Sequence, residues 1–217
     1  MASSKIVDLR KLLAERFASA PPSPSAVLPT GVKALDDRIG GGLPKGGITE
    51  ITSAHASSGT ATLIAALLHK AHCERYFVAV VDARDSFDPQ SAAGPTLPHL
   101  LWVRCHNAGH AVRSADLLLR DGNFPIVVLD LILNASSELR GIPQTTWYRL
   151  QRLVEKIPTA FLVLSRDSIV ASAQLKLALQ SRWTLGDLEI ENNSEVLTLE
   201  LRRCHIAPSE AQQQLAS

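Results

Sequence analysis

The chain has 217 residues, of which 46% are apolar and 20% are charged, and its formal net charge is +1. This length and apolar content suffice for one domain with a full core, and they argue against a globally disordered chain. The total charge is too low to indicate nucleic-acid binding by itself, so a basic patch would have to be local.

The cysteines and the apolar runs exclude further classes of protein. Cys73, Cys105 and Cys204 lie far apart, and neither a zinc site nor a closed disulfide framework fits their number and spacing. The first residues, MASSKIVDLRKLL, lack the long apolar region of a secretory signal. No apolar run approaches the ~20 residues of a membrane helix. We therefore expect a cytoplasmic protein with no metal site and no membrane association.

Residues 1–17 are predicted to contain an amphipathic helix. Its apolar side chains recur at spacings of three and four and would share one face: Ile6, Leu9, Leu13 and Phe17. This face would pack either on the chain's own core or, as a detached arm, on another protein. Residues 18–30 contain four prolines and three serines, which is typical of an extended linker and favours the arm.

Residues 31–205 are predicted to form the core, and the polar tail 206–217 is expected to be disordered. A short helix with a glycine-rich turn at 31–46 precedes a strand at 48–52. Near-continuous apolar strands then alternate with helices: strands at 77–81, 100–105, 125–131 and 159–165, and helices at 108–122 and 145–157. This alternation predicts an α/β fold with a mostly parallel central sheet flanked by helices. Residues 168–181 fit a loop or a helix, and 195–203 fit a later strand of antiparallel character.

The segment between the strand at 48–52 and the next helix has the layout of a phosphate-binding loop. Such a loop needs the pattern G-x-x-x-x-G-K-[ST], in which backbone N–H groups and the lysine contact phosphates and the hydroxyl binds Mg²⁺. Here Ala54 takes the first glycine position, Gly59 the second, Thr60 that of the lysine and Ala61 that of the hydroxyl residue. Only Gly59 matches the pattern. Ser57 and Ser58 complete this degenerate nucleotide loop.

Several stretches in the same order resemble the core of the RecA recombinase family. The first is LPTGVKALDDRIGGGLPKGGITEITSAHASSGTATL, and the second is VVDARDSFDPQ, where Arg84 matches the glutamate that activates water in RecA. PIVVLDL resembles the Walker B strand and keeps its aspartate as Asp130. Arg166 lies at or beside the position of the glutamine that senses the γ-phosphate. The resemblance covers about residues 29–204 and implies a RecA-like core with an N-terminal helical arm.

The departures from the RecA pattern imply an inactive ATPase homologue. Lysine, Mg²⁺ ligand, catalytic glutamate and sensor are all replaced, so no route remains to stabilise the phosphoryl-transfer transition state. We therefore expect no catalytic residue and no bound cofactor. Asp130 and the acidic residues near it would then cap strand ends and pair with arginines.

Within RecA-like proteins, the chain is most similar to the ImuA family of bacterial mutagenesis cassettes. The stretches that carry this resemblance are LRKLLAERF, GGGLPKG, DSFDPQSA, LLWVRC, ADLLLRDGN and TTWYRLQRLVE. It implies a role in SOS-induced translesion DNA synthesis through contacts with RecA or with ImuB, the polymerase-like partner, and with further copies of itself. In RecA two loops face DNA, here roughly 133–144 and 166–176. They and their surroundings would offer weak single-stranded DNA contacts through Arg140, Arg166, Lys176 and Arg182.

Two other functions stay open. The chain could be an unusual DNA-dependent ATPase that uses Ser57, Ser58, Thr60 or Thr62 together with Arg84. It could also be a cell-division inhibitor like SulA, a nucleotide-free RecA-like protein that blocks FtsZ.

Overall fold

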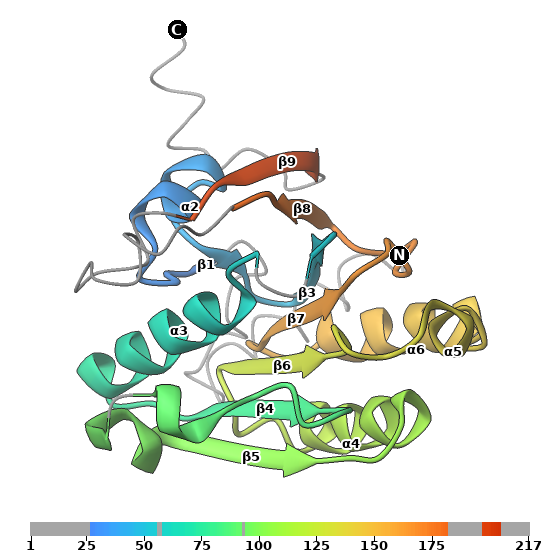
Figure 1. The fold of residues 1–217 in the computed structure, drawn as a ribbon, viewed down its shortest axis with the longest axis horizontal. Coiled ribbons are helices and arrows are strands. Elements are labelled where there is room, and N and C mark those ends of the chain that lie inside the picture. Colours follow the sequence, from blue (N-terminus) through green and yellow to red (C-terminus); the bar gives the residue numbers. More distant parts are fainter. Residues whose placement is uncertain (1–26, 56–57, 93, 182–196, 205–217) are drawn as a thin grey trace, which may run out of the picture.

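A central seven-stranded sheet organises the part of the chain that the computed structural model describes, namely residues 27–55, 58–92, 94–181 and 197–204. The strand order is β5-β4-β6-β7-β3-β8-β9, and neighbours are parallel except β8 and β9 (Figure 1). The strands of this sheet are β3 (Gly47–Ser53), β4 (Val78–Asp82), β5 (Leu100–Arg104), β6 (Ile126–Asp130), β7 (Ala160–Ser165), β8 (Leu175–Leu179) and β9 (Leu199–Cys204). The predicted α/β fold with a mostly parallel sheet is confirmed.

Helices cover both faces of this sheet (Figure 1). The helical elements are α2 (Lys33–Arg38), α3 (Thr60–Glu74), η1 (Pro89–Ser91), η2 (Gly94–His99), α4 (Ala108–Asp121), α5 (Ser136–Arg140) and α6 (Gln144–Val154). Val78 and Val80 of β4 pack in one core with Leu67 of α3, while Val81 packs in a second core with Trp147 of α6. Because successive strand residues face opposite sides, burial on both faces explains the near-continuous apolar strands. None of the helices in these ranges combines the length and apolar character needed to span a bilayer.

The core begins earlier than the sequence predicted. Strand β1 (Val27–Leu28) pairs with β2 (Leu43–Pro44), and Leu28 is buried. Thr30 is also buried and donates its N–H and hydroxyl to the carboxylate of Asp36 at 3.0 and 2.8 Å. Residues 27–30 therefore belong to the core and not to the predicted 18–30 linker. The arm, residues 18–26 and the tail 206–217 lie outside the described residues.

One glycine is required where β1 and β2 meet. Gly42 has φ +153°, and a Cβ there would lie 2.3 Å from the carbonyl oxygen of Leu28. No side chain fits at this distance, so the glycine-rich turn is needed for the two strands to approach.

The segment 168–181, which fitted a loop or a helix, is a loop as far as residue 174 and then a strand. Leu175, Leu177 and Leu179 are buried, whereas Lys176 and Ala178 are only partly buried, which gives the period of two that defines β8. The sequence did not distinguish a strand from a helix here. The reason is that β8 lies between β3 and β9 with one of its faces only partly covered, so the alternation of buried and exposed residues is weak. The predicted antiparallel extension is confirmed by the pairing of β8 with β9.

A fully buried carboxylate joins three parts of this sheet. Glu50, in the middle of β3, accepts from the backbone N–H groups of Ile169 and Val170 at 2.6 and 2.8 Å. Its other oxygen accepts from the hydroxyl of Ser168 at 2.8 Å and pairs with the ammonium group of Lys176 at 2.8 Å. Glu50 thus holds the segment after β7 against β3, and it ties β8 to β3 through the side chain of Lys176.

We expect Glu50→Gln to lower the free energy of unfolding by roughly 3–5 kcal/mol, because it leaves Lys176 with no counter-charge in a largely buried place. Urea unfolding followed by circular dichroism measures this loss. The matched control is Asp37→Asn, which breaks the exposed Lys33–Asp37 pair and should cost less than about 1 kcal/mol. Equal losses in the two variants would contradict the structural role of Glu50.

Candidate functional site

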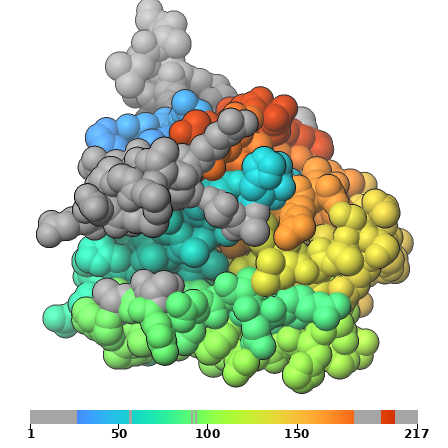
Figure 2. Space-filling model, viewed as in Figure 1, coloured from blue at the N-terminus to red at the C-terminus, as the bar shows by residue number. Residues whose placement is uncertain are grey.

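The loop between β3 and α3 takes the place of a phosphate-binding loop. It reaches the surface at the cyan segment of Figure 2, where Ala54 and His55 are exposed. Ser58, Gly59 and Thr60 are buried. Gly59 has φ +104°, a left-handed conformation that favours glycine, and it directly precedes the first residue of α3. The predicted strand–loop–helix layout is therefore present.

The hydroxyl groups of this loop bond to the loop itself. The carbonyl oxygen of His55 accepts from the Ser53 hydroxyl at 2.6 Å, from the Ser58 hydroxyl at 2.9 Å and from the Ser58 N–H at 3.3 Å. A carbonyl oxygen has two lone pairs, so three donors saturate it. The loop is thus closed by its own polar groups. Ser57 lies outside the described residues.

The position of the missing lysine is occupied by a small, buried side chain. Thr60 is the first residue of α3 and is 7% exposed, and Ala61 beside it is exposed but has no hydroxyl. The amino end of a helix attracts an anion by ~0.3–1 kcal/mol. Among the described loop residues, no lysine or arginine adds to this attraction, so the arrangement favours phosphate only weakly.

Two buried carboxylates lie side by side at the ends of β4 and β6, at the same edge of the sheet as this loop. Asp82 and Asp130 are register partners, and both are almost fully buried. The hydroxyl of Ser86 lies 3.0 Å from Asp82 Oδ1 and 2.7 Å from Asp130 Oδ2. One hydroxyl hydrogen serves only one of these bonds, so a proton on one carboxyl group satisfies both.

That proton belongs on Asp130. Burial, aided by the charge of Asp82, raises the pKa of Asp130 to about 6, although bonds from the Ile132 N–H and from Ser86 oppose the rise. Asp82 in turn accepts N–H groups from the following turn, from Arg84 at 3.1 Å and from Phe87 at 3.0 Å. The prediction that the acids at this edge cap strand ends and pair with arginines is confirmed in part: Asp82 and Asp130 accept N–H groups at their strand ends, and Asp85 pairs with Arg104. Asp130 bonds to Ser86 and to the Ile132 N–H at 3.0 Å, and not to an arginine within the described residues.

Arg84, at the position of the catalytic glutamate, forms an ion pair with Glu138 at 3.1 Å. Glu138 also accepts from the Ala108 N–H at 2.7 Å and from the Asn134 amide at 3.0 Å. The bond from Asn134 first, and then those from the Ala108 N–H and Arg84, hold the pKa of Glu138 below its ordinary value. Arg84 therefore links the turn after β4 to α5 and to the start of α4.

The two segments expected to face DNA lie next to each other. The Ser136 hydroxyl donates to Asp167, and the Gln144 amide donates to the carbonyl oxygen of Ile169 at 3.1 Å. Arg140 and Arg166 extend from these segments and are exposed.

The other two predicted DNA contacts differ from this pair. Lys176 is bonded to Glu50 and to the Ser168 hydroxyl, so its ammonium group has a structural role. Arg182 lies outside the described residues, as do the predicted docking residues of the arm: Ile6, Leu9, Leu13 and Phe17.

Metal-ligating side chains do not gather here. Within the described ranges, no group of three or more His, Cys, Asp or Glu side chains is placed to hold a metal ion. The pair Asp82 and Asp130 is satisfied by Ser86 and by backbone N–H groups.

Comparison with known proteins places most of this fold in one family. The RecA N-terminal domain family matches residues 19–152, which are more than half of the chain. The chain belongs to the RecA N-terminal domain family. It is similar to Protein RecA of Francisella philomiragia subsp. philomiragia, and to those of Francisella tularensis subsp. novicida and subsp. tularensis. Each is 38% identical over 122 residues, covering 53% of this chain and 33% of the relative. The chain thus spans about a third of the length of these RecA proteins.

Sequence reasoning missed the polar network of this RecA-like site. Glu50 is a single acid inside an apolar strand, which is itself a signal, since a buried charge requires partners. Asp82 and Asp130 end strands that turned out to be neighbours, and the strand order, which the sequence did not provide, brings them together. Ser86 has no distinctive sequence signal.

The raised pKa of Asp130 makes folding stability depend on pH. Its folded pKa of about 6 exceeds the ordinary value of 3.8, so its contribution is complete below about pH 4 and is lost as pH rises through about 6. We expect Asp130→Asn to remove this loss, because the amide donates to Ser86 at every pH. Urea midpoints measured from acid to neutral pH test this.

The expected result is a variant that is more stable than the wild type at neutral pH, by up to about 3 kcal/mol. Asp116→Asn, which changes a carboxylate that pairs with Arg120 on α4, is the control for the general loss of one acid. Parallel pH curves for wild type and Asp130→Asn would contradict the shared proton.

Proposed function

We propose that this chain is a non-catalytic RecA-like accessory protein of SOS-induced translesion DNA synthesis, acting through contacts with RecA, with ImuB or with both. The observation that carries the proposal is the internal bonding of the degenerate loop. The hydroxyls of Ser53 and Ser58 close on the His55 carbonyl, and Thr60 stands where a lysine would reach the phosphates.

Phosphoryl transfer depends on positioning and on charge stabilisation, which separate groups supply. In this chain the counterparts of those groups have other partners: Asp130 is bonded to Ser86, and Arg84 is paired with Glu138. A single replacement could be compensated. Replacement at the lysine, the Mg²⁺ ligand, the catalytic glutamate and the sensor together supports a protein that keeps the fold without the chemistry.

The process and the partners rest on the resemblance to the ImuA family. Within that proposal, assembly with RecA, with ImuB or with another copy uses the N-terminal arm. Single-stranded DNA is a minor partner, because only Arg140 and Arg166 of the four predicted contacts are both described and exposed. DNA affinity normally requires several phosphate contacts, each of which releases counterions.

A second candidate function is an unusual DNA-dependent ATPase. The retained Asp130, at the end of β6 and at the same edge of the sheet as the loop, is the observation that favours it. The third, a division inhibitor like SulA, has only fold similarity behind it. Co-sedimentation with FtsZ filaments separates it from the other two.

The accessory role predicts that the purified chain releases no phosphate from ATP above the no-protein background, with or without single-stranded DNA. A sensitive phosphate-release assay, with RecA as the positive control, measures this. Asp130→Asn is the matched variant and should behave like the wild type. DNA-stimulated release that disappears in Asp130→Asn would instead establish the ATPase.

Removal of residues 1–17 should leave a folded core, because the core starts at β1, but should abolish assembly with the partner. Burial of four apolar side chains contributes roughly 6–10 kcal/mol before ordering costs. Light scattering gives the mass of the full and truncated chains, alone and mixed with RecA or ImuB, each with and without ATP. We expect a nucleotide-independent complex that only the full chain forms.

Leu9→Ala combined with Leu13→Ala should weaken this complex as the truncation does, whereas Lys11→Ala, on the opposite face of the predicted helix, should not. Unchanged mass and unchanged partner binding after truncation would rule out the arm as the docking element. Assembly that requires ATP would mean that the degenerate loop still binds nucleotide.

A further inference from the structure

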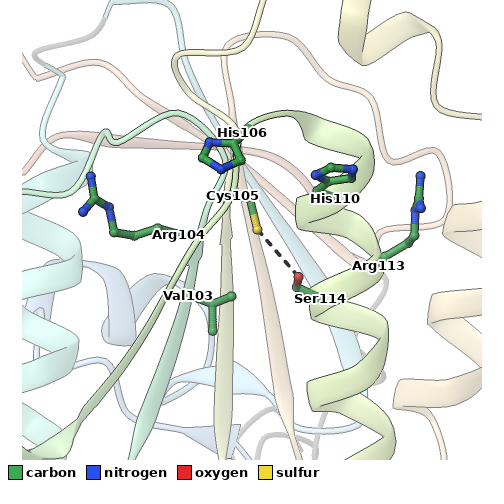
Figure 3. A pocket seen from close by; sticks show the side chains of 7 residues that line it. All are labelled: Val103, Arg104, Cys105, His106, His110, Arg113 and Ser114. Atoms are coloured by element: carbon green, nitrogen blue, oxygen red, sulfur yellow. Dashed lines mark hydrogen bonds between the residues drawn. The ribbon is translucent and has the colours of Figure 1, made fainter.

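A pocket of about 330 Å³ lies between the carboxyl end of β5 and the first turns of α4. Its lining residues are Val103, Arg104, Cys105, His106, His110, Arg113 and Ser114 (Figure 3). Four of these side chains are basic, and none of the described residues that line the pocket is acidic.

A thiol and a hydroxyl group lie at the bottom of the pocket, and basic side chains surround them. The Cys105 thiol and the Ser114 hydroxyl lie 3.6 Å apart and join β5 to α4. Figure 3 shows the basic groups level with the start of α4, while Val103 precedes them on β5. The imidazole of His106 lies at the end of the strand and that of His110 on the first turn of the helix, and the guanidinium group of Arg113 extends beside His110 (Figure 3).

Arg104 differs from the other basic groups because it already has a partner. Its guanidinium group bonds to Asp85 at 2.7 Å and lies 4.9 Å from the centre of the Trp102 ring. Within the described residues, the structure gives His106, His110 and Arg113 no ion-pair partner. The guanidinium group of Arg113 is therefore an unpaired cation at this pocket, and the two imidazoles beside it offer ring N–H donors.

The acids near the pocket are already neutralised. Asp85 is paired with Arg104, and Glu138 is paired with Arg84 while it accepts the Ala108 N–H. The Asn107 side chain accepts the His110 N–H at 2.8 Å, so the end of α4 is capped by the chain itself. An anion in the pocket would meet side-chain donors and no unpaired carboxylate.

We propose that this pocket binds a phosphate group, with Arg113 as the main cation and His106 and His110 as further donors. An arginine guanidinium matches two phosphate oxygens at once, and charge-assisted bonds of this kind are the stronger ones. The volume exceeds that of a phosphate alone, so the group is carried either by a small phosphate ester or by a nucleic-acid strand. This site is separate from the degenerate loop after β3, and it does not depend on the accessory role proposed above.

The test is an NMR titration of the full-length chain with inorganic phosphate, at constant ionic strength set with chloride. We expect saturable shifts of backbone amides in residues 104–114. Arg113→Gln should weaken binding roughly tenfold, as the loss of one charge-assisted contact implies. Arg120→Gln is the matched control, since it changes an exposed arginine of the same helix that pairs with Asp116, and it should leave the affinity unchanged.

Two further probes distinguish the sources of the phosphate. These are a single-stranded oligonucleotide with a 5′-phosphate and the same oligonucleotide without it. Binding of inorganic phosphate and of the 5′-phosphorylated strand alone assigns the pocket to terminal phosphate esters, whereas equal binding of both strands assigns it to backbone phosphates. No saturable shift in residues 104–114 with any probe, or equal weakening by Arg113→Gln and Arg120→Gln, would overturn the proposal.

Discussion

The wholly buried carboxylate of Glu50 is the constraint on which the arrangement of this protein depends. A charge in such a place is tolerated only if donors surround it, and here two backbone N–H groups, one hydroxyl and one ammonium group do so. All four donors come from the segment after β7 and from β8. The same strand, β3, ends in the loop that takes the place of a phosphate-binding loop. One buried charge therefore holds the segment after β7, and β8, against the strand that leads into this loop.

Other polar groups of the site also bond to each other. The His55 carbonyl closes the loop by accepting from Ser53 and Ser58, and Ser86 lies between Asp82 and Asp130. In a nucleotide-binding site such groups would be left to the ligand and its metal, at a cost in stability when the site is empty. A site whose polar groups bond to each other is stable without a ligand. This property favours the use of the RecA-like fold as a scaffold, as the accessory role requires.

The sequence predicted the elements of the fold well and their polar contacts poorly, for a physical reason. Apolar strands and amphipathic helices are visible locally, so β4, β6, β7, α4 and α6 could be placed within a few residues. The start of the core was missed because proline-rich composition at 18–30 concealed β1, whose pairing with β2 depends on the close approach at Gly42. Lys176 was taken for a surface cation because its partner, Glu50, is distant in sequence and becomes its neighbour only through the pairing of β3 with β8.

The distribution of free and paired cations bears on what the protein can recognise. Arg84, Arg104 and Lys176 are matched by Glu138, Asp85 and Glu50, so their charges do not contribute to long-range attraction. Arg140 and Arg166 are exposed at the segments after β6 and β7. The two cations of these segments would by themselves give weak and salt-sensitive affinity for a nucleic-acid strand, since each phosphate contact adds only one increment of counterion release. A recruiting role must then draw most of its binding energy from apolar protein contacts, and this argument, independent of the loop chemistry, also favours the N-terminal arm.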